Sequence, residues 1–239
     1  MKGYLNKSKL IWLGALALVL AAPSSRAQFE VGINGTTGVN NIVWDDTTTI
    51  WNAPFGTPAV NAPGSNQTGG LATDNVIFGN HRNATAGSQA YRVNNRNVGE
   101  INDLAVGSTN STFSKTVVLQ VRGNNGNLQV NGTTTLGSLG GGIDQSGQLS
   151  LNQNSTTATL NLRGPVTTGS NQNGNAIVLN SNLSTLNIGG DITLGVGTRR
   201  IDLRLARGTL ILDTSGDGIT DTGAQVFALD MLDIGDSTV

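Results

Sequence analysis

The sequence predicts an all-β protein built as a right-handed parallel β-helix, or β-solenoid, with an irregular N-terminal cap region that contains aromatic residues. The composition supports this, because the 239 residues include 33 glycines, 12% charged residues and 4% aromatic residues. Val, Ile, Leu and Thr recur in short alternating runs, which is the pattern of half-buried strands. The one helical candidate is the short segment 224–232, AQVFALDML.

The short alternating runs follow one another at near-regular intervals from about residue 98 onward. They include TVVLQVRG, NLQVNG, QLSLN, ATLNLRG, AIVLNS, STLNIGG and GTLILD. Two of them contain closely similar segments, TLNLRG at 159–164 and TLNIGG at 185–190. Because the spacing is uneven, the sequence predicts a degenerate repeat with a period of about 20 to 25 residues, as in parallel β-helices.

A β-helix explains these residue types physically. Each pass of the chain stacks its strands on the pass below at a spacing of about 4.8 Å. Inward Leu, Ile and Val side chains then fill a narrow core, Asn and Thr stack in ladders, and Gly forms the corners. An antiparallel β-sandwich uses strands at a similar spacing and is the alternative fold. The β-helix is preferred because the strands are short and carry Asn and Gly corners instead of hairpin pairs.

Residues 1–27 have the three parts of a secretory signal peptide. Three lysines precede an apolar run at positions 10–22, and small residues at Ser25 and Ala27 fit cleavage after Ala27. The apolar run is shorter than the roughly 20 residues that a membrane-spanning helix needs. We therefore expect residues 28–239 to be exported without a transmembrane segment.

The exported chain divides into three parts by composition. Residues 28–97 form a predicted N-terminal cap region, because they hold most of the aromatic residues and a long polar loop. Residues 98–213 carry the strand repeats, and residues 214–239 form an acidic C-terminal segment.

Three segments of the cap region, VWD at 43–45, IWN at 50–52 and NVIFG at 75–79, resemble the start of secreted bacterial proteins with autotransporter-associated β-strand repeats. TLNIGGDITLG at 185–195 and RGTLILD at 207–213 are similar to the body of that family. The resemblance implies a right-handed β-helical passenger that is displayed at the bacterial surface. It is a resemblance to the passenger only, and not to the C-terminal membrane barrel of autotransporters.

Charge and residue usage argue against several classes of function. Four of the 14 basic residues and none of the 15 acidic residues lie in the predicted signal peptide, which leaves an acidic chain with Lys115 as its only lysine. Such a chain has no basic patch for nucleic acid. The sequence has no cysteine, and His81 is its only histidine. No hydrolase, metalloprotease or phosphate-binding motif is present, so we identify no catalytic residue. Asp202 and Arg204 are expected to share a strand face as a surface ion pair.

The segment DTSGDGITD at 213–221 has the spacing of a calcium-binding loop, with oxygen ligands at positions 1, 3, 5 and 9 and Gly218 at the sharp bend. The candidate ligands are Asp213, Ser215, Asp217 and Asp221. The twelfth position is Ala224, where an EF-hand has a bidentate Glu. A site of this kind is expected to bind calcium with roughly millimolar affinity. The alternative is an acidic turn at the end of a strand.

Two functions from different classes follow from this sequence. The first is a structural, adhesin-like protein of the extracellular space or the outer-membrane surface, whose Asn, Thr and Ser ladders contact glycans or other cell-surface components. The second is a secreted carbohydrate-active β-helix enzyme, a polysaccharide lyase or hydrolase, which needs converging carboxylates in a groove. We favour the first, because no pair of acidic residues stands out.

Overall fold

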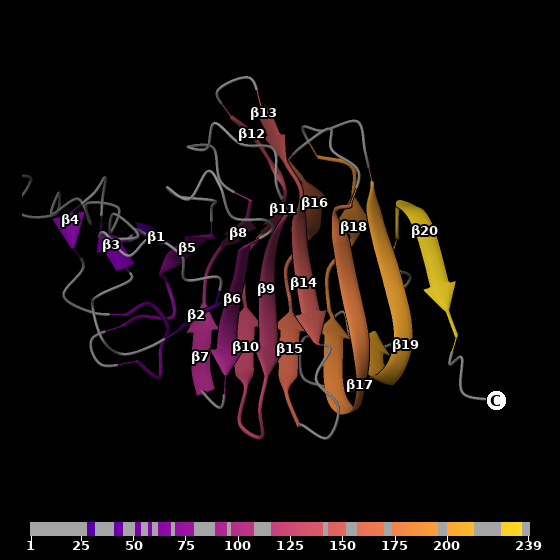
Figure 1. Ribbon diagram of the computed structural model, residues 1–239, viewed down its shortest axis with the longest axis horizontal. Helices are drawn as coiled ribbons and strands as arrows, with labels where there is room; N and C mark the ends of the chain where they lie inside the picture. Colours follow the sequence, from indigo (N-terminus) through magenta and orange to yellow (C-terminus); the bar gives the residue numbers. More distant parts are fainter. Residues whose placement is uncertain are drawn as a thin grey trace, which may run out of the picture.

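The computed structural model describes residues 28–31, 41–44, 51–53, 57–58, 62–67, 70–78, 89–94, 97–107, 116–140, 143–151, 157–169, 174–195, 200–212 and 226–235. Over these ranges the chain forms a right-handed parallel β-helix, which confirms the predicted fold class (Figure 1). Within the same ranges no helix is long and apolar enough to cross a membrane.

Each pass of the solenoid runs through three faces, which we call faces I, II and III in chain order. Faces I and II belong to one sheet, because the long strands β17 and β19 bend from face I into face II. The strands of this sheet are β2 (Asn41–Val43), β6 (Gln89–Asn94), β7 (Asn97–Ile101), β9 (Val117–Arg122), β10 (Asn127–Val130), β14 (Gly147–Leu151), β15 (Thr159–Leu162), β17 (Ala176–Ile188), β19 (Ile201–Leu212) and β20 (Leu229–Ile234). Face I contains β2, β6, β9, β14, β20 and the first halves of β17 and β19, and face II contains β7, β10, β15 and their second halves.

Face III lies in a second sheet of short strands. Its strands are β5 (Asn75–Phe78), β8 (Leu104–Val106), β11 (Thr134–Leu136), β16 (Val166–Thr168) and β18 (Ile192–Thr193), and the sheet continues through β1 (Gln28–Val31), β3 (Trp51–Ala53) and β4 (Thr57–Pro58). An antiparallel hairpin of β12 (Ser138–Gly140) and β13 (Ile143–Gln145) projects from the corner between faces III and I (Figure 1).

The core consists of inward side chains that stack in columns along the solenoid axis. Alternate residues of each strand are buried, because neighbouring side chains of a strand point to opposite faces. One column on each face is, in order, Leu119, Leu149, Ile177 and Leu203 on face I; Leu128, Leu160, Leu186 and Leu210 on face II; and Val76, Leu104, Thr134, Val166 and Ile192 on face III.

The two similar segments found in the sequence lie on neighbouring passes. Residues 159–162 pair in parallel with residues 185–188, so that Leu160 lies beside Leu186 and Asn161 beside Asn187. This parallel pairing is incompatible with the alternative antiparallel sandwich. The predicted period of 20 to 25 residues holds for the second halves of β17 and β19, where Thr185 pairs with Thr209, 24 positions away. Most other neighbouring passes are longer, with paired residues 26 to 32 positions apart from β5 to β18. Corner segments and the β12–β13 hairpin lengthen the passes.

The helical candidate at 224–232 is wrong. Residues Leu229–Ile234 form β20, which pairs in parallel with β19. Leu232 lies beside Leu203 and Ile234 beside Leu205, so β20 continues two inward columns. Pairing with β19 therefore overrides the helix propensity of the Ala and Leu residues in this segment.

The corner between faces II and III needs residues without a side chain. Gly132, Gly164 and Gly190 occupy equivalent positions on three successive passes. A Cβ atom on Gly164 or Gly190 would overlap the backbone of the pass below. Glycine therefore lets the passes approach each other closely at this corner.

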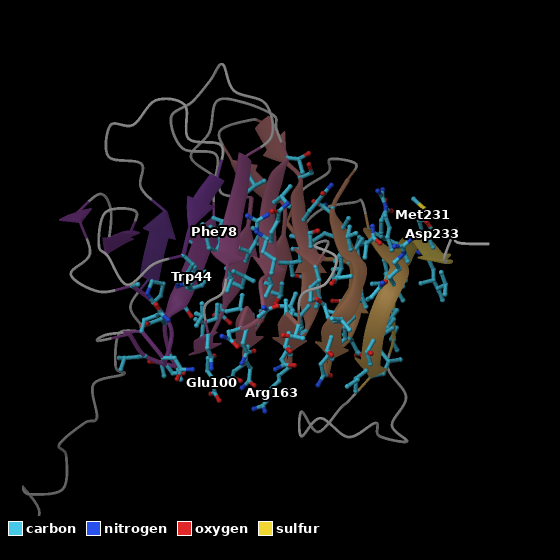
Figure 2. The ribbon with its side chains drawn as sticks, turned by 60° about the horizontal axis from the view of Figure 1, so that its bottom comes forward. Trp44, Phe78, Glu100, Arg163, Met231 and Asp233 are labelled. Atoms are coloured by element: carbon cyan, nitrogen blue, oxygen red, sulfur yellow. The ribbon has the colours of Figure 1, made fainter. Side chains whose placement is uncertain are left out.

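A cap of residues 62–67 covers face II at the N-terminal end of the solenoid. Residues 62–67 cover the free edge of β7, where Ser65 N donates to Glu100 O at 2.9 Å and Glu100 N donates to Ser65 Oγ at 2.8 Å. The buried Trp44 packs on Phe78 with ring centroids 5.4 Å apart, and its Nε1 donates to Pro63 O at 3.1 Å (Figure 2). Such a cover protects an edge strand from pairing with other chains.

Asp74 holds the backbone of this cap in place. Its side chain is 1% exposed, and its Oδ2 accepts hydrogen bonds from Leu71 N at 2.7 Å and Gly64 N at 3.2 Å. Burial raises the pKa of the Asp74 carboxyl group above its ordinary value of 3.8, although the two backbone hydrogen bonds act in the opposite direction.

The opposite end of the described solenoid differs from the capped end. Among the described strands, β20 pairs only with β19. Leu232 and Ile234 stand in inward columns, yet they are 54% and 70% exposed. Met231 and Asp233 mark this end in Figure 2. Apolar side chains in line with the core are therefore exposed to solvent at β20.

Two buried threonines of face III are expected to respond oppositely to the same substitution. Thr134 is fully buried and its hydroxyl has no partner among the described residues, whereas the buried Thr168 accepts a hydrogen bond from Gly195 N at 3.3 Å. Thr134→Val should raise the free energy of unfolding by about 1 kcal/mol, and Thr168→Val should lower it by about 1 kcal/mol. Urea unfolding followed by circular dichroism measures both. A loss of stability in Thr134→Val would contradict this account of the core.

Asp74 is expected to make stability depend on pH. Because its pKa is higher in the folded than in the unfolded protein, protonation favours the folded state. The stability that this group contributes is complete below the unfolded value and is lost as the pH rises through the folded value. Asp74→Asn should therefore become more stable relative to the unchanged protein as the pH increases from about 4 towards neutrality.

The measurement for Asp74 is urea unfolding at a series of pH values. Asp233→Asn, at the exposed end of β20, is the matched control. A stability difference between Asp74→Asn and the unchanged protein that stays constant with pH would refute the burial effect.

Candidate functional site

The sequence-predicted calcium ligands lie outside the described residues, as does the predicted cleavage site at Ala27. The four ligands concerned are Asp213, Ser215, Asp217 and Asp221. The calcium loop therefore stays a prediction. In the ranges that the structure does describe, no cluster of three or more His, Cys, Asp or Glu side chains could hold a metal ion.

Asp202 and Arg204 share face I, as predicted from their spacing. Asp202 Oδ2 and Arg204 Nη2 are 2.8 Å apart, and the side chains are 15% and 43% exposed. A partly exposed pair of this kind adds little stability. Asp233 lies beside Arg204 on the neighbouring strand β20.

Face II carries polar side chains that bond to one another. Asn131 Nδ2 donates to Glu100 Oε2 at 2.9 Å, and Gln129 Nε2 donates to Asn131 Oδ1 at 2.8 Å. Asn127 Nδ2 also donates to Asn97 Oδ1 at 3.2 Å. Glu100 and Arg163 lie along the same edge of the solenoid (Figure 2). Much of the hydrogen-bonding capacity of this part of face II is thus used within the protein.

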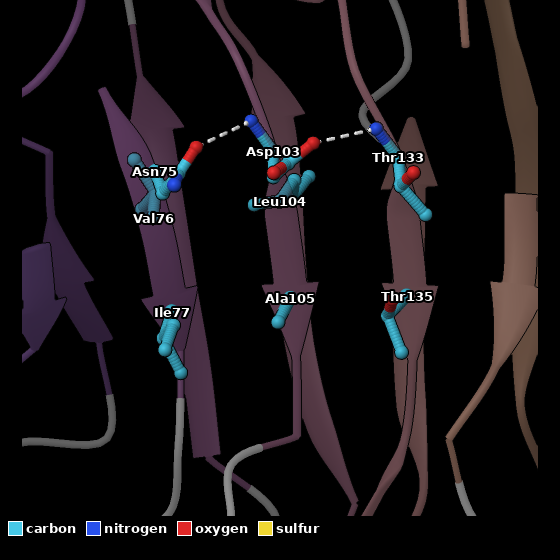
Figure 3. A pocket seen from close by; sticks show the side chains of 8 residues that line it. All are labelled: Asn75, Val76, Ile77, Asp103, Leu104, Ala105, Thr133 and Thr135. Carbon is cyan, nitrogen blue, oxygen red and sulfur yellow. Dashed lines mark hydrogen bonds between the residues drawn. The ribbon is translucent and has the colours of Figure 1, made fainter. Parts of the chain in front are cut away.

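Face III has a groove in its outer surface. The outward column of this face runs through Ile77, Ala105, Thr135, Thr167 and Thr193, and Ala105 has the smallest side chain in it. The groove has a volume of about 290 Å³ (Figure 3). Its lining consists of Asn75, Val76, Ile77, Asp103, Leu104, Ala105, Thr133 and Thr135.

One end of the groove is formed at the corner between faces II and III. Asp103 Oδ1 accepts a hydrogen bond from Thr133 N at 2.8 Å, on the next pass. Asn75 Oδ1 accepts hydrogen bonds from Asp103 N at 3.2 Å and from Asn102 Nδ2 at 2.8 Å. Each corner side chain thus fixes the backbone of the pass above it (Figure 3).

Later passes deal differently with the backbone N–H groups at this corner. Thr133 has neither an amide nor a carboxylate side chain, and the equivalent position of the next pass is Pro165, which has no N–H to be satisfied. One pass further, Asp191 Oδ1 accepts a hydrogen bond from Val226 N at 2.9 Å. The Asp and Asn residues at this corner therefore have a structural role wherever an N–H lies above them.

Three polar atoms at this end of the groove have spare capacity. Within the described part of the chain, no hydrogen bond uses Asp103 Oδ2, Asn75 Nδ2 or the Thr133 hydroxyl group. All three side chains are partly exposed. The groove therefore combines an acceptor, a donor and a hydroxyl group with the apolar side chains of Ile77 and Ala105.

This arrangement suits binding of a polar, uncharged group. Of the described residues that line the groove, Asp103 alone is ionisable. A general acid and a general base would require two such groups, and hard cations take six or more oxygen ligands. The groove is accordingly fitted to accept and donate hydrogen bonds.

The groove is not among the sites predicted from the sequence. The signal that could have revealed it is the set of segments in equivalent positions, NVIF at 75–78, DLAV at 103–106 and TTTL at 133–136. Aligned in this register, they show Ala105 between Ile77 and Thr135 on the outer face. They also show Asn, Asp and Thr at the corner position.

Comparisons with known proteins provide no further guide to the site. No protein-family model, curated protein or solved structure matches this chain significantly.

The structural role of Asp103 leads to a graded expectation. Asp103→Ala removes the acceptor for Thr133 N and should lower the free energy of unfolding by about 1 to 2 kcal/mol. Asp103→Asn should cost less, because Asn75 performs the same role one pass earlier through its Oδ1. Urea unfolding measures both variants, and equal losses for Ala and Asn would argue against the corner hydrogen bond.

Proposed function

We propose that the chain is an exported, structural protein of the extracellular space or the bacterial outer surface, and that it acts as an adhesin-like β-helix for glycans or other cell-surface components. The β-solenoid supports this proposal, since stacked passes produce long, rigid outer surfaces. The proposed export depends on the signal-peptide pattern in residues 1–27.

The observation that carries the proposal is the repetition of hydroxyl side chains in register. Thr159, Thr185 and Thr209 form one outward column on face II, and Thr135, Thr167 and Thr193 form another on face III. Side chains in such a column are spaced by the distance between strands, about 4.8 Å. A surface of this kind can make many weak, equivalent contacts with a repetitive polymer, and such contacts add up through multivalency.

The resemblance to autotransporter passengers is consistent with this role, and we propose a passenger-like mode of display. Neutral glycans are the preferred partners in this proposal. The exported chain is acidic and carries a single lysine, so attraction to polyanions is not expected.

Adhesion of the purified protein to an array of immobilised neutral and acidic glycans tests this function. We expect binding to neutral glycans that changes little with salt concentration, because no counterions need to be released. A single change, Thr185→Val, should weaken adhesion less than about threefold, whereas changing Thr159, Thr185 and Thr209 together should weaken it by more than about tenfold. The matched control replaces the same three residues with Ser, which keeps the hydroxyl groups.

Fractionation of the native cells and N-terminal sequencing complete the test. The protein is expected outside the cytoplasm with Gln28 as its first residue. Adhesion that disappears with one Thr substitution, a preference for acidic glycans, or retention in the cytoplasm would count against the proposed function.

A further inference from the structure

We infer that the groove on face III is a binding subsite for one neutral sugar ring, which it holds through two adjacent hydroxyl groups. This inference rests on the proposed adhesin-like function and names the site at which a single saccharide unit is recognised. It assigns direct contacts to Asn75, Asp103 and Thr133, with Ile77 and Ala105 forming the apolar wall.

The size of the groove limits the ligand to a small unit. Its volume of about 290 Å³ lies just below the range of roughly 300 to 1,000 Å³ that is typical of small-molecule sites. The space exists because Ala105 occupies a position that carries Ile77 on the pass below and Thr135 on the pass above. A larger side chain at position 105 would fill it.

The polar atoms match a pair of neighbouring hydroxyl groups. A hydroxyl group donates one hydrogen bond and accepts others, so a diol is satisfied by an acceptor and a donor that lie side by side. Asp103 Oδ2 is such an acceptor and Asn75 Nδ2 such a donor, on adjacent passes of the solenoid. The Thr133 hydroxyl group can serve a third oxygen of the ligand in either role.

The contacts inside the protein hold these groups in place before a ligand arrives. Asp103 is oriented by the hydrogen bond from Thr133 N to its Oδ1, at 2.8 Å. Asn75 is oriented by two hydrogen bonds to its Oδ1, at 2.8 and 3.2 Å. Both side chains therefore offer their remaining atom without losing further rotamer freedom, which favours binding.

The lining also disfavours anions and hard metal cations. A single carboxylate gives too few ligands for a hard cation, and it repels anions such as a uronic acid. The apolar atoms of Ile77 and Ala105 lie beside the polar corner, as expected for contact with the C–H groups of a sugar ring.

The test uses the purified protein and soluble methyl glycosides of glucose, galactose and mannose, with glucuronate as the charged probe. Ligand-observed NMR titration and calorimetry measure binding to a single site. At least one neutral glycoside should bind saturably and more tightly than glucuronate, which the Asp103 carboxylate repels. Ala105→Ile, which fills the groove with the side chain found at position 77, should weaken that binding at least about tenfold, equivalent to about 1.4 kcal/mol.

Two further variants make the test specific. Asp103→Asn keeps the acceptor for Thr133 N but replaces the free acceptor with a donor, and it should also weaken binding about tenfold. Val178→Ile places the same side chain on the outer surface of face I, away from the groove and from both threonine columns, and should change binding by less than about twofold. Circular dichroism confirms that each variant is folded.

The outcomes separate this inference from the proposed function. Loss of monovalent glycoside binding in Ala105→Ile and Asp103→Asn, with adhesion to glycan surfaces partly retained, supports both. Two results would contradict the sugar subsite without contradicting the adhesin-like function. These are adhesion without any saturable monovalent binding, and monovalent binding that Ala105→Ile leaves unchanged. A preference for glucuronate also overturns the groove as a neutral-sugar site. Absence of adhesion to every glycan overturns the proposed function, and the inference that rests on it.

Discussion

The rest of this structure depends on the parallel hydrogen bonding of each pass of the chain to the next. The backbone of each strand pairs in register with the strand of the next pass. Equivalent residues of successive passes therefore share the same inward or outward side-chain orientation. Leu128, Leu160, Leu186 and Leu210 follow this rule on face II. Because a slip of one residue would turn a whole strand inside out, the alternation of apolar and polar residues sets the register as well as the core.

The corners are where this constraint is hardest to satisfy, and they explain the polar residues that surround the groove. Glycines at 132, 164 and 190 let the backbones come together, while Asn75, Asp103 and Asp191 provide acceptors for amides that the strands do not pair. Pro165 solves the same problem by having no amide hydrogen. Asn75 and Asp103, which are proposed to bind a sugar, therefore also stabilise the corners of the fold.

Much of the fold could be predicted from the sequence, because alternation and similarity between segments are local signals. The similarity of residues 159–162 to residues 185–188 predicts equivalent positions on neighbouring passes, and the two segments do pair. Pass length could not be predicted, since corner segments of variable length add no pattern. The helix predicted for residues 224–232 is wrong because the strand in this segment depends on pairing with β19, which no local pattern shows. The groove could not be predicted for a related reason, since Asn75, Asp103 and Thr133 become neighbours only through the register of the strands. The predicted calcium loop falls outside the described residues.

The two ends of the solenoid are unequal, and this sets the order in which it can come apart. A stacked pass is held only by its neighbours, so losing the outermost one breaks a single interface. The end at β20 shows apolar core to solvent, whereas the end near Trp44 is covered and hydrogen-bonded. Within the described part of the solenoid, unravelling should therefore start at β20 and move towards β14, leaving β5, β8 and β11 assembled until late. A molecule partly unfolded by shear would therefore keep the groove on face III intact.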